Sequence, residues 1–417
     1  MSTRLLRRAA VAAAAALTAS ACSASGADDG KSHVTVWMYP VIKDEAAGKK
    51  FWERTESAFE KTHPGIDLNI ELQTFDKRDA QISAALAAGT GPDIVLITPD
   101  QAATYNKVGG LLPVDDAVAE QRKTFFPATL KAATIDGKLY GVPIFQNINS
   151  TAYNTKIFAD AGLGLPKTWD DVRKAAPVLA KRGVAVMDYA GSPEQTLNLS
   201  FYPLLWQAGG RVFSGDGKDV AFDSAEGVSA LQFLVDLKKA GGLPADAATE
   251  GPAVQGAPIA ASKVAMRPVT SLPELDQMRA ALGAKNVSLG LPLQGKVRAT
   301  YGNPGLLSLT SINKDENRDA AYDVLAYLSS PTTQKSLNAA AGSFPTRTDV
   351  KAPSTGPDYQ VLNEALQFAN PGESSPAARQ VMASLAPGIQ AALGGDLSPK
   401  EALDKAAKEA RELLSRS

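Results

Sequence analysis

The stretch Ala85–Ile97, which reads ALAAGTGPDIVLI, decides the fold class of this chain. A helical pattern over 78–88 ends at Gly89, and a compact apolar run over 93–97 follows between proline-containing turns. Glycine commonly ends a helix, and a short run of branched apolar residues between turn signals indicates a buried strand. Strands buried on both faces are typical of parallel sheets that helices cover. The stretch therefore predicts an α/β layer.

The same alternation of strand and helix patterns extends along the chain in both directions. Alternating apolar and polar residues predict strands, and apolar residues at helical spacing predict helices between them. Gly215-Asp216-Gly217 predicts a hairpin turn, and Asp223 with Glu226 resembles a capping box at the start of a helix. The predicted strands are 34–38, 66–72, 149–153, 184–187, 264–266, 287–291 and 305–309, and the predicted helices are 46–62, 168–181, 223–239, 316–329, 332–341, 357–369 and 377–415.

The beginning of the chain predicts export. Three arginines precede an uncharged, alanine-rich run over 9–21, and Cys22 follows directly. A basic start, a short apolar stretch and small residues before a cut form the layout of a signal peptide. The run is too short for a membrane span, which needs about 20 apolar residues. We predict a signal peptide over 1–21 and a flexible tether over 22–32, since the latter holds mainly small and polar residues.

The residues around Cys22 resemble a bacterial lipobox, in which the cysteine is acylated after the signal is removed. Small residues precede it, although the lipobox pattern prefers leucine where Ala19 stands. The alternative is that Cys22 is a chance small hydrophobe inside an ordinary signal. Two acyl chains are enough for stable anchoring. The lipidation reading predicts a lipoprotein on the outer face of the cytoplasmic membrane.

Composition limits the function classes. A chain of 417 residues is too long for one compact core and suggests two domains. A formal net charge of −1 gives no basic field for nucleic acid. The two histidines, His33 and His63, form no metal-ligand motif, and the nucleophile elbow and the phosphate-binding loop are missing. We therefore predict no metal, no cofactor and no enzyme, while paired carboxylates among the 44 acidic residues stay open.

Aromatic residues near predicted loops are the strongest candidates for ligand contacts. Trp37 and Tyr39 lie at the carboxyl end of the first strand, the edge where open α/β sheets bind ligands. Tyr202 and Trp206 share one face of a helix, and Tyr301 lies in a loop. A sugar presents an apolar face that a ring can cover and hydroxyls that amide and charged groups can bind. The alternative is that aromatic residues at helical spacing pack in a core.

Eight segments, in order along residues 33–415, resemble the extracellular solute-binding proteins, family 1, which deliver sugars to ABC importers. The most specific is 85–94, which is similar to the family's A-x-G-x-x-P-D segment. A segment over 342–347 is similar to its G-x-x-P-x-R motif near the end. The other matching segments are 59–66, 110–116, 136–143, 153–162, 167–172 and 207–210.

The resemblance implies an α/β fold with two lobes, the type II periplasmic-binding-protein fold. Each lobe would hold a mostly parallel sheet flanked by helices, and a hinge of three chain crossings would join the lobes. It places lobe 1 at 33–144 plus 307–344, lobe 2 at 145–306 plus 345–417, and the crossings near 142–147, 306–308 and 344–347.

The resemblance also implies a ligand site between the lobes. One departure is that Ser262–Val269 lacks the tryptophan that follows this segment in the family, so Arg267 is expected to take part of its role. Arg347, beside a crossing, would either bind ligand or brace the hinge. The expected contacts are Trp37, Tyr39 and Asp100 from lobe 1 and Gln146, Asn147, Glu194, Trp206, Arg267 and Tyr301 from the hinge and lobe 2.

The expected function is that of a monomeric binding protein that captures a mono- or oligosaccharide between its lobes. It would hand this carbohydrate to the transmembrane subunits of an ABC permease. One alternative keeps the fold and changes the ligand to a peptide, a polyamine or an anion. The other is an exported glycan-active hydrolase that uses two carboxylates.

Overall fold

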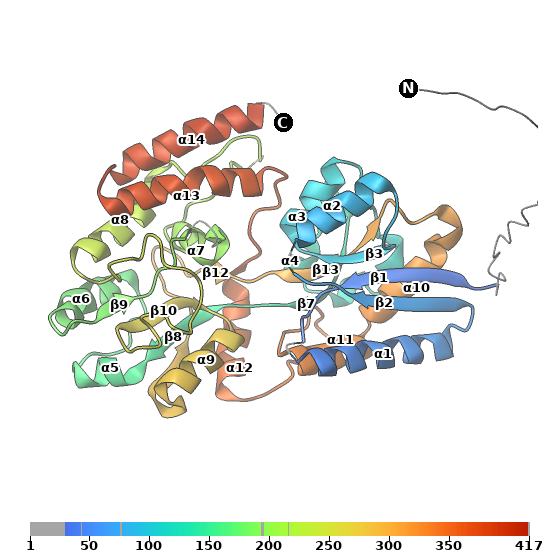
Figure 1. Ribbon diagram of the computed structural model, residues 1–417, viewed down its shortest axis with the longest axis horizontal. Helices are drawn as coiled ribbons and strands as arrows, with labels where there is room; N and C mark the ends of the chain where they lie inside the picture. The colour runs from blue at the N-terminus through green and yellow to red at the C-terminus, as the bar shows by residue number, and fades with distance from the viewer. Residues whose placement is uncertain (1–29, 43, 76, 193–195, 216, 416–417) are drawn as a thin grey trace, which may run out of the picture.

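The computed structural model describes residues 30–42, 44–75, 77–192, 196–215 and 217–415, and these form two lobes (Figure 1). The predicted signal peptide, Cys22 and nearly all of the predicted tether lie outside the described residues, as does Glu194. Within the described ranges, every helix is too short or too polar to traverse a bilayer.

Lobe 1 is built on a six-stranded sheet in the order β2-β1-β3-β13-β4, with β7 also paired to β13. The predicted apolar strand is β3, and all four of its residues are buried at the centre of the sheet. The strands are β1 (Ser32–Met38), β2 (Ile66–Leu72), β3 (Ile94–Ile97), β4 (Leu111–Leu112), β7 (Val142–Gln146) and β13 (Pro304–Thr310).

Helices cover this sheet, and the residues at their ends explain where they begin and end. Asp44 caps α1 by accepting a hydrogen bond from the amide of Ala47, and α1 buries Trp52 and Phe59. The next helix, α2, ends at Gly89 in the left-handed conformation (φ 65°), which glycine adopts without strain. The main helices of lobe 1 are α1 (Glu45–Thr62), α2 (Arg78–Ala88), α3 (Pro99–Lys107), α4 (Pro127–Ala132), α10 (Arg318–Leu328) and α11 (Pro331–Ala341).

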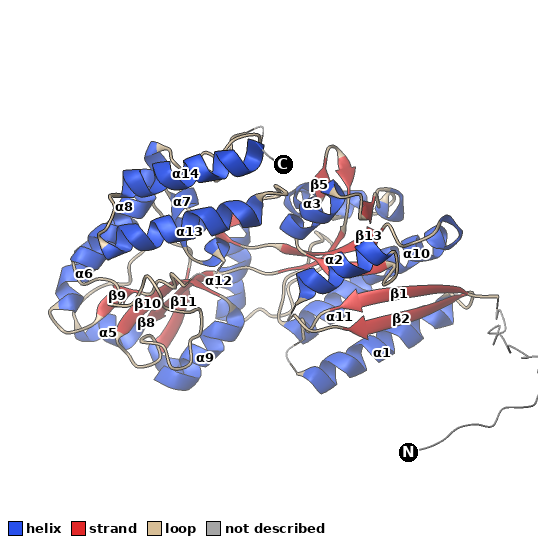
Figure 2. Cartoon of the chain, turned by 45° about the horizontal axis from the view of Figure 1, so that its top comes forward, coloured by secondary structure: helices blue, strands red, loops and turns tan. Residues whose placement is uncertain are grey.

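Lobe 2 holds a four-stranded sheet in the order β11-β8-β10-β9. Its two C-terminal helices, α13 and α14, lie side by side along one side of the lobe (Figure 2). The strands are β8 (Ser150–Asn154), β9 (Ala185–Met187), β10 (Val264–Thr270) and β11 (Val287–Gly290). The main helices are α5 (Thr155–Asp160), α6 (Trp169–Ala180), α7 (Phe201–Gln207), α8 (Ala225–Lys239), α9 (Leu272–Leu282), α13 (Ala378–Gly394) and α14 (Pro399–Ser415).

The sheets are mixed, whereas the resemblance implied mostly parallel ones. In lobe 1, β1 runs parallel to β2 and β3, but β13 runs antiparallel to β3, β4 and β7. In lobe 2, β8 runs antiparallel to β10 and β11, and only the pair β10–β9 is parallel. In lobe 1 the reason is connectivity, because β13 enters its sheet from the other lobe and not through a helical crossover.

The hinge is made of chain segments that lie side by side between the lobes (Figure 1). The chain passes from β7 to β8 through 147–149, and the amide of Asn147 donates to the carbonyl of Asn303 at 3.0 Å. A short strand, β12 (Thr300–Tyr301), leads into β13 and pairs with β14 (Ala369–Asn370). The third segment includes α12 (Pro357–Ala365), which packs on the hinge residues Ile148 and Phe344.

Hydrogen bonds indicate the residues at which the chain passes from one lobe to the other. The strand β7 stays in the lobe 1 sheet to Gln146, and β13 joins that sheet already at Pro304. Thr346 and Arg347, expected in lobe 2, bond to Gln334 and Gln121 of lobe 1. We infer crossings at 147–149, at 302–303 and beyond Arg347.

The helix expected over 223–239 begins two residues later. Ser224 is its N-cap and accepts from the amide of Gly227, whereas Asp223 forms an ion pair with Arg411. The Asp223–Glu226 capping box was therefore wrong by one position, because serine caps a helix as well as aspartate does. The expected hairpin is present and short: Phe213 and Val220 form an antiparallel bridge, and the amide of Ala221 donates to the carbonyl of Val212 at 2.8 Å. The last helical pattern divides into α13 and α14 at Gly395.

Candidate ligand-binding cleft

A cavity of about 490 Å³ lies between the two lobes. Arg78, Thr98 and Asp100 line it from lobe 1. The turn 196–198 and the 379–390 segment of α13 contribute lining residues from lobe 2, and Tyr301 of the hinge strand completes the wall. The volume is within the range of about 300–1,000 Å³ that small-molecule sites have. Because both lobes contribute, a ligand bound here would hold them together.

A second cavity, of about 390 Å³, lies beside the hinge. Asn147 and Asn303 line it from the crossings, Phe344 lines it from the third segment, and Tyr301 borders it as well. Tyr301 therefore borders both cavities. Burial raises the pKa of its hydroxyl, and the nearby Asp100 carboxylate raises it further. The phenol consequently stays protonated and can donate a hydrogen bond.

The sequence places Asp100 at the mouth of the main cavity through a short β3–α3 connection. Pro99 occupies the first helical turn, and Thr98 and Gln101 form a capping box around it. The hydroxyl of Thr98 donates to Oδ1 of Asp100 at 2.5 Å. Since α3 follows directly on the central strand, Asp100 lies at the carboxyl edge of the sheet, where open α/β folds bind ligands.

An aromatic stack lies at the same edge. The rings of Tyr39 and Phe75 stack with centroids 5.4 Å apart, and the guanidinium of Arg78 lies 5.3 Å and 5.6 Å from the two centroids. Tyr39 is fully buried, and burial raises its pKa to about 12. Phe75 is 53% exposed. The stack thus holds Arg78 in place on the wall of the cavity.

The structure brings some of the expected contacts together at these cavities and places others elsewhere. Asp100 and Tyr301 line the main cavity, and Asn147 lines the second one. Trp37 donates from its indole to Glu71 at 2.9 Å, and Gln146 donates to the carbonyl of Pro345 at 2.8 Å. Trp37 and Gln146 therefore bond within lobe 1 and the hinge, and the ring of Tyr39 stacks on Phe75.

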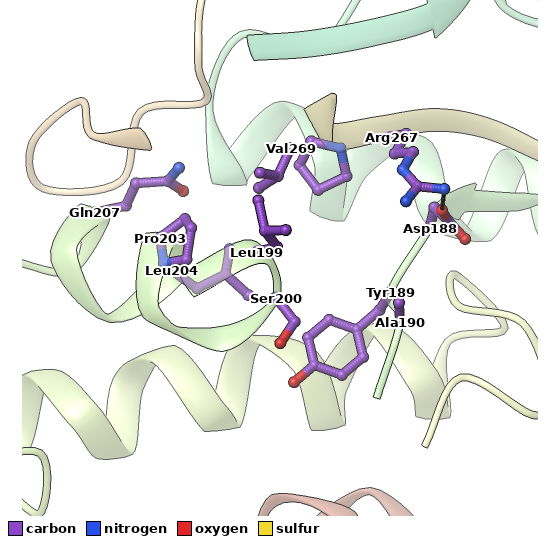
Figure 3. Close-up of a pocket in the computed structure, with 11 residues that line it drawn as sticks. Asp188, Tyr189, Ala190, Leu199, Ser200, Pro203, Leu204, Gln207, Arg267 and Val269 are labelled. Atoms are coloured by element: carbon purple, nitrogen blue, oxygen red, sulfur yellow. Dashed lines mark ion pairs between the residues drawn. The ribbon is translucent and has the colours of Figure 1, made fainter. Parts of the chain in front are cut away.

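Arg267 is committed to lobe 2 and is not a substitute for a stacking platform. Figure 3 shows its guanidinium turned toward Asp188, with which it pairs at 3.3 Å. It also pairs with Glu274 at 2.9 Å and donates to the carbonyl of Pro252. The side chain is 5% exposed and borders a small cavity of about 20 Å³. Burial raises the pKa of Asp188, and the charge of Arg267 opposes that rise.

Two other expected contacts lie inside the lobes. Trp206 is 6% exposed and packs with the fully buried Tyr202. The helical spacing of this pair therefore reflects packing in the core of lobe 2. Arg347 is 2% exposed, lies over the ring of Phe125 at 4.9 Å and donates to Asp349 at 2.9 Å. Of the two roles expected for Arg347, this environment supports bracing.

The sequence missed several residues of the main cavity. Arg78 follows β2 much as Tyr39 follows β1, and the parallel pairing of these two strands was a usable signal for Arg78. No sequence signal marked Asn198 and Arg379 as cavity residues, because they lie in lobe 2, far along the chain from the lobe 1 residues that line the cavity.

Glu373 is an acid of lobe 2 whose titration should change the stability of the fold. Burial raises its pKa to about 7, while a hydrogen bond from Trp206 and the charge of Arg211 oppose the rise. A carboxyl whose pKa is raised by folding adds stability to the fold at pH values below its unfolded-state pKa. This stability is lost as the pH rises through the folded-state pKa. Glu373→Gln should therefore match the wild type near pH 4 and be more stable by up to about 3 kcal/mol near pH 8.

Urea unfolding at both pH values measures this difference. The exposed Glu409→Gln variant is the control for the loss of a carboxyl at the surface. An equal offset for Glu373→Gln at pH 4 and pH 8 would contradict the prediction.

Known proteins match both the sequence and the fold. The family described as bacterial extracellular solute-binding protein matches residues 39–335. The diacetylchitobiose binding protein of Streptomyces coelicolor is 29% identical over 161 residues, which are 36% of this chain and 37% of that protein. The arabinooligosaccharide-binding protein of Bacillus subtilis is 26% identical over 231 residues, 53% of this chain and 51% of that protein. The chain spans about half the length, or less, of the curated relatives it matches.

Solved structures show the fold over nearly the whole chain. The cyclic α-maltosyl-1,6-maltose binding protein from Arthrobacter globiformis superposes with a TM-score of 0.78 and 22% identity, over 93% of this chain and 100% of that one. The implied two-lobe, type II periplasmic-binding-protein fold is therefore confirmed. The family match covers residues 39–335, which is well over half of the 417 residues. The chain belongs to the bacterial extracellular solute-binding proteins.

Proposed function

We propose that this protein is the substrate-binding component of an ABC importer and captures a mono- or oligosaccharide between its lobes. The observation that carries the proposal is the 490 Å³ cavity, which both lobes and Tyr301 line. A ligand can shift the balance between open and closed lobes only if it contacts the two states differently. A ligand in this cavity meets that condition, since closure alone brings the lobe 1 and lobe 2 contacts to it.

The chemistry of the wall suits a neutral polyol. The ring of Tyr301 can cover the C–H face of a pyranose, and Asn198, Asp100 and Arg78 can bind hydroxyls. Among the residues that the structure describes, the charges near the cavity balance, with Arg78 and Arg379 against Asp79 and Asp100. This balance favours an uncharged ligand over a polyamine or an anion.

The named relatives point the same way. Two of the curated relatives are binding proteins for diacetylchitobiose and for arabinooligosaccharides, and the superposed Arthrobacter protein binds a cyclic maltosyl-maltose. We propose a mono- or oligosaccharide as the ligand of this chain on the same chemistry, with a permease as its partner and the monomer as its working form.

Membrane attachment through Cys22 belongs to the same proposal. Cys22 follows a signal-like segment, and a lipid at that position would keep the binding lobes close to a permease on the outer face of the cytoplasmic membrane. Intact mass measurement of protein from membranes of the native host tests this: a mature chain that begins at Cys22 with added acyl mass supports it, and an unmodified thiol contradicts it.

Calorimetric titration against a panel of mono- and oligosaccharides tests the function. We expect one sugar to bind at a stoichiometry of one without turnover. Tyr301→Ala should weaken that binding by about 10- to 100-fold, because it removes the ring from the wall of the cavity. Tyr301→Phe should lose only the hydroxyl's share, about 10-fold or less.

The other outcomes separate the alternatives. Binding of a peptide, polyamine or anion in place of every sugar would keep the fold and replace the ligand. Release of a shorter glycan would indicate the hydrolase. Wild-type affinity in Tyr301→Ala would exclude the cavity at Tyr301 as the sugar site.

A further inference from the structure

The side chain of Arg379 links the two lobes outside the hinge. Arg379, in the first turn of α13 of lobe 2, donates from Nη1 to Oδ2 of Asp79 at 2.6 Å and from Nε to Oδ2 of Asp100 at 3.1 Å. Asp79 belongs to α2 and Asp100 to α3, both in lobe 1. Figure 1 shows α2 and α3 on the side of lobe 1 that α13 approaches.

We propose that Arg379 is a positioning residue for ligand binding, whose two ion pairs hold the lobes closed over the 490 Å³ cavity. This inference rests on the proposed function, since it concerns how the cleft closes on its ligand. It adds an electrostatic clasp, formed by Arg379, Asp79 and Asp100, that acts on the lobes whether or not a sugar is bound.

Lobe 1 holds both carboxylates of the clasp in place without help from lobe 2. Asp79 accepts hydrogen bonds from the side-chain amide of Gln101 and from the hydroxyl of Tyr105. Asp100 accepts from Thr98. Closing the clasp therefore immobilises mainly one side chain, Arg379, and this lowers the entropic cost of its ion pairs.

The clasp borders the place where ligand would bind. Arg379 and Asp100 both line the main cavity, next to Tyr301. Moving α13 away from lobe 1 would break both ion pairs and widen the cavity, so opening and loss of the clasp are one event. A side chain that stabilises the closed arrangement raises the population able to grip ligand, and hence the apparent affinity.

The exposure of the clasp predicts a modest and salt-sensitive effect. The side chains of Arg379 and Asp79 are about half exposed, at 50% and 45%, and that of Asp100 is 18% exposed. Exposed ion pairs change an equilibrium by about fivefold or less each. The two together should change the closed-to-open ratio by about 3- to 20-fold at low salt, and less at 1 M salt, where the screening length falls to about 3 Å.

The chain offers a matched control in Arg411. Its guanidinium also pairs with two aspartates, Asp219 at 2.8 Å and Asp223 at 2.9 Å, and it is 43% exposed. All three of these residues belong to lobe 2. Arg411→Gln thus removes an equivalent pair of ion pairs without touching the contact between lobes.

The experiment measures the distance between spin labels on the two lobes. Labels go on cysteines at Val108 of lobe 1 and Val178 of lobe 2, two of the exposed apolar positions. Cys22→Ser in every variant removes the only native thiol. Distances are recorded without sugar at about 0.05 M and 1 M sodium chloride for the wild type, Arg379→Gln, Arg379→Lys and Arg411→Gln.

We expect a shorter-distance population in the wild type that falls when salt is raised. Arg379→Gln should reduce it by about 3- to 20-fold at low salt and remove its salt dependence, Arg379→Lys should restore part of it, and Arg411→Gln should leave it unchanged. Equal distance distributions in Arg379→Gln and the wild type would overturn the clasp, as would an equal shift in Arg411→Gln. Because no sugar is present, failure of the sugar titrations leaves this result interpretable.

Discussion

Replacing Arg267 by methionine should lower the free energy of unfolding by about 3–5 kcal/mol. Arg267 is the counter-charge of Asp188, which is 4% exposed, and of Glu274. Methionine fills a similar volume but leaves two carboxylates inside lobe 2 without a cation. The loss arises because uncompensated buried charge is costly, and not because the ion pairs themselves add much net stability.

Chemical unfolding as a function of pH tests the cause of this loss. Burial already raises the pKa of Asp188, and removing Arg267 takes away the charge that opposes the rise. A carboxyl with a raised folded-state pKa destabilises more as pH rises, so the defect should shrink when pH falls from 8 to 5. Asp188→Asn in the same chain should recover part of the loss. A pH-independent defect would point to lost packing and away from charge.

Replacing Trp206 by alanine should cost about 3–5 kcal/mol of folding stability, the range for truncating a large buried aromatic residue. Trp206 packs in the core of lobe 2 beside Tyr202, and hydrogen bonding by its side chain opposes the rise in the pKa of Glu373. The variant leaves a cavity and also removes a donor from a carboxyl that is mostly buried. Trp206→Phe should cost less, because it keeps much of the volume.

Unfolding in denaturant and calorimetry on the folded variant measure the two properties separately. We expect the sugar affinity of folded Trp206→Ala to remain within about threefold of the wild type, since Trp206 borders neither of the interlobe cavities. The opposite pattern, normal stability with lost affinity, would place Trp206 in the ligand site, where the sequence had led us to expect it.

Local patterns predicted most elements of the fold correctly. The run over 93–97 is the buried central strand β3, and Gly89 ends α2 as expected. These features depend on neighbours a few residues apart, through capping, backbone freedom and apolar periodicity. Strand direction was predicted less well, because it depends on how the chain crosses between lobes.

The expected contacts that line the interlobe cavities are those at a strand end or in the hinge. Asp100, Asn147 and Tyr301 line the interlobe cavities, and each follows such a local rule. Trp206 and Arg267 do not line these cavities. Their helical spacing and charge could not have shown this, because a core residue and a ligand contact can share both features. Whether a side chain is in the core or at a cleft depends on what packs against its element.

By itself, the sequence determined that this chain has α/β layers, an export-like start and the motif order of the extracellular solute-binding proteins. Only the tertiary structure decided that Arg379 meets Asp79 and Asp100, or that Arg267 is occupied by Asp188. The physical reason is the distance along the sequence between the residues that interact. Secondary structure and capping depend on residues within one or two turns, whereas an ion pair between residues 300 positions apart forms only when folding has brought both lobes together.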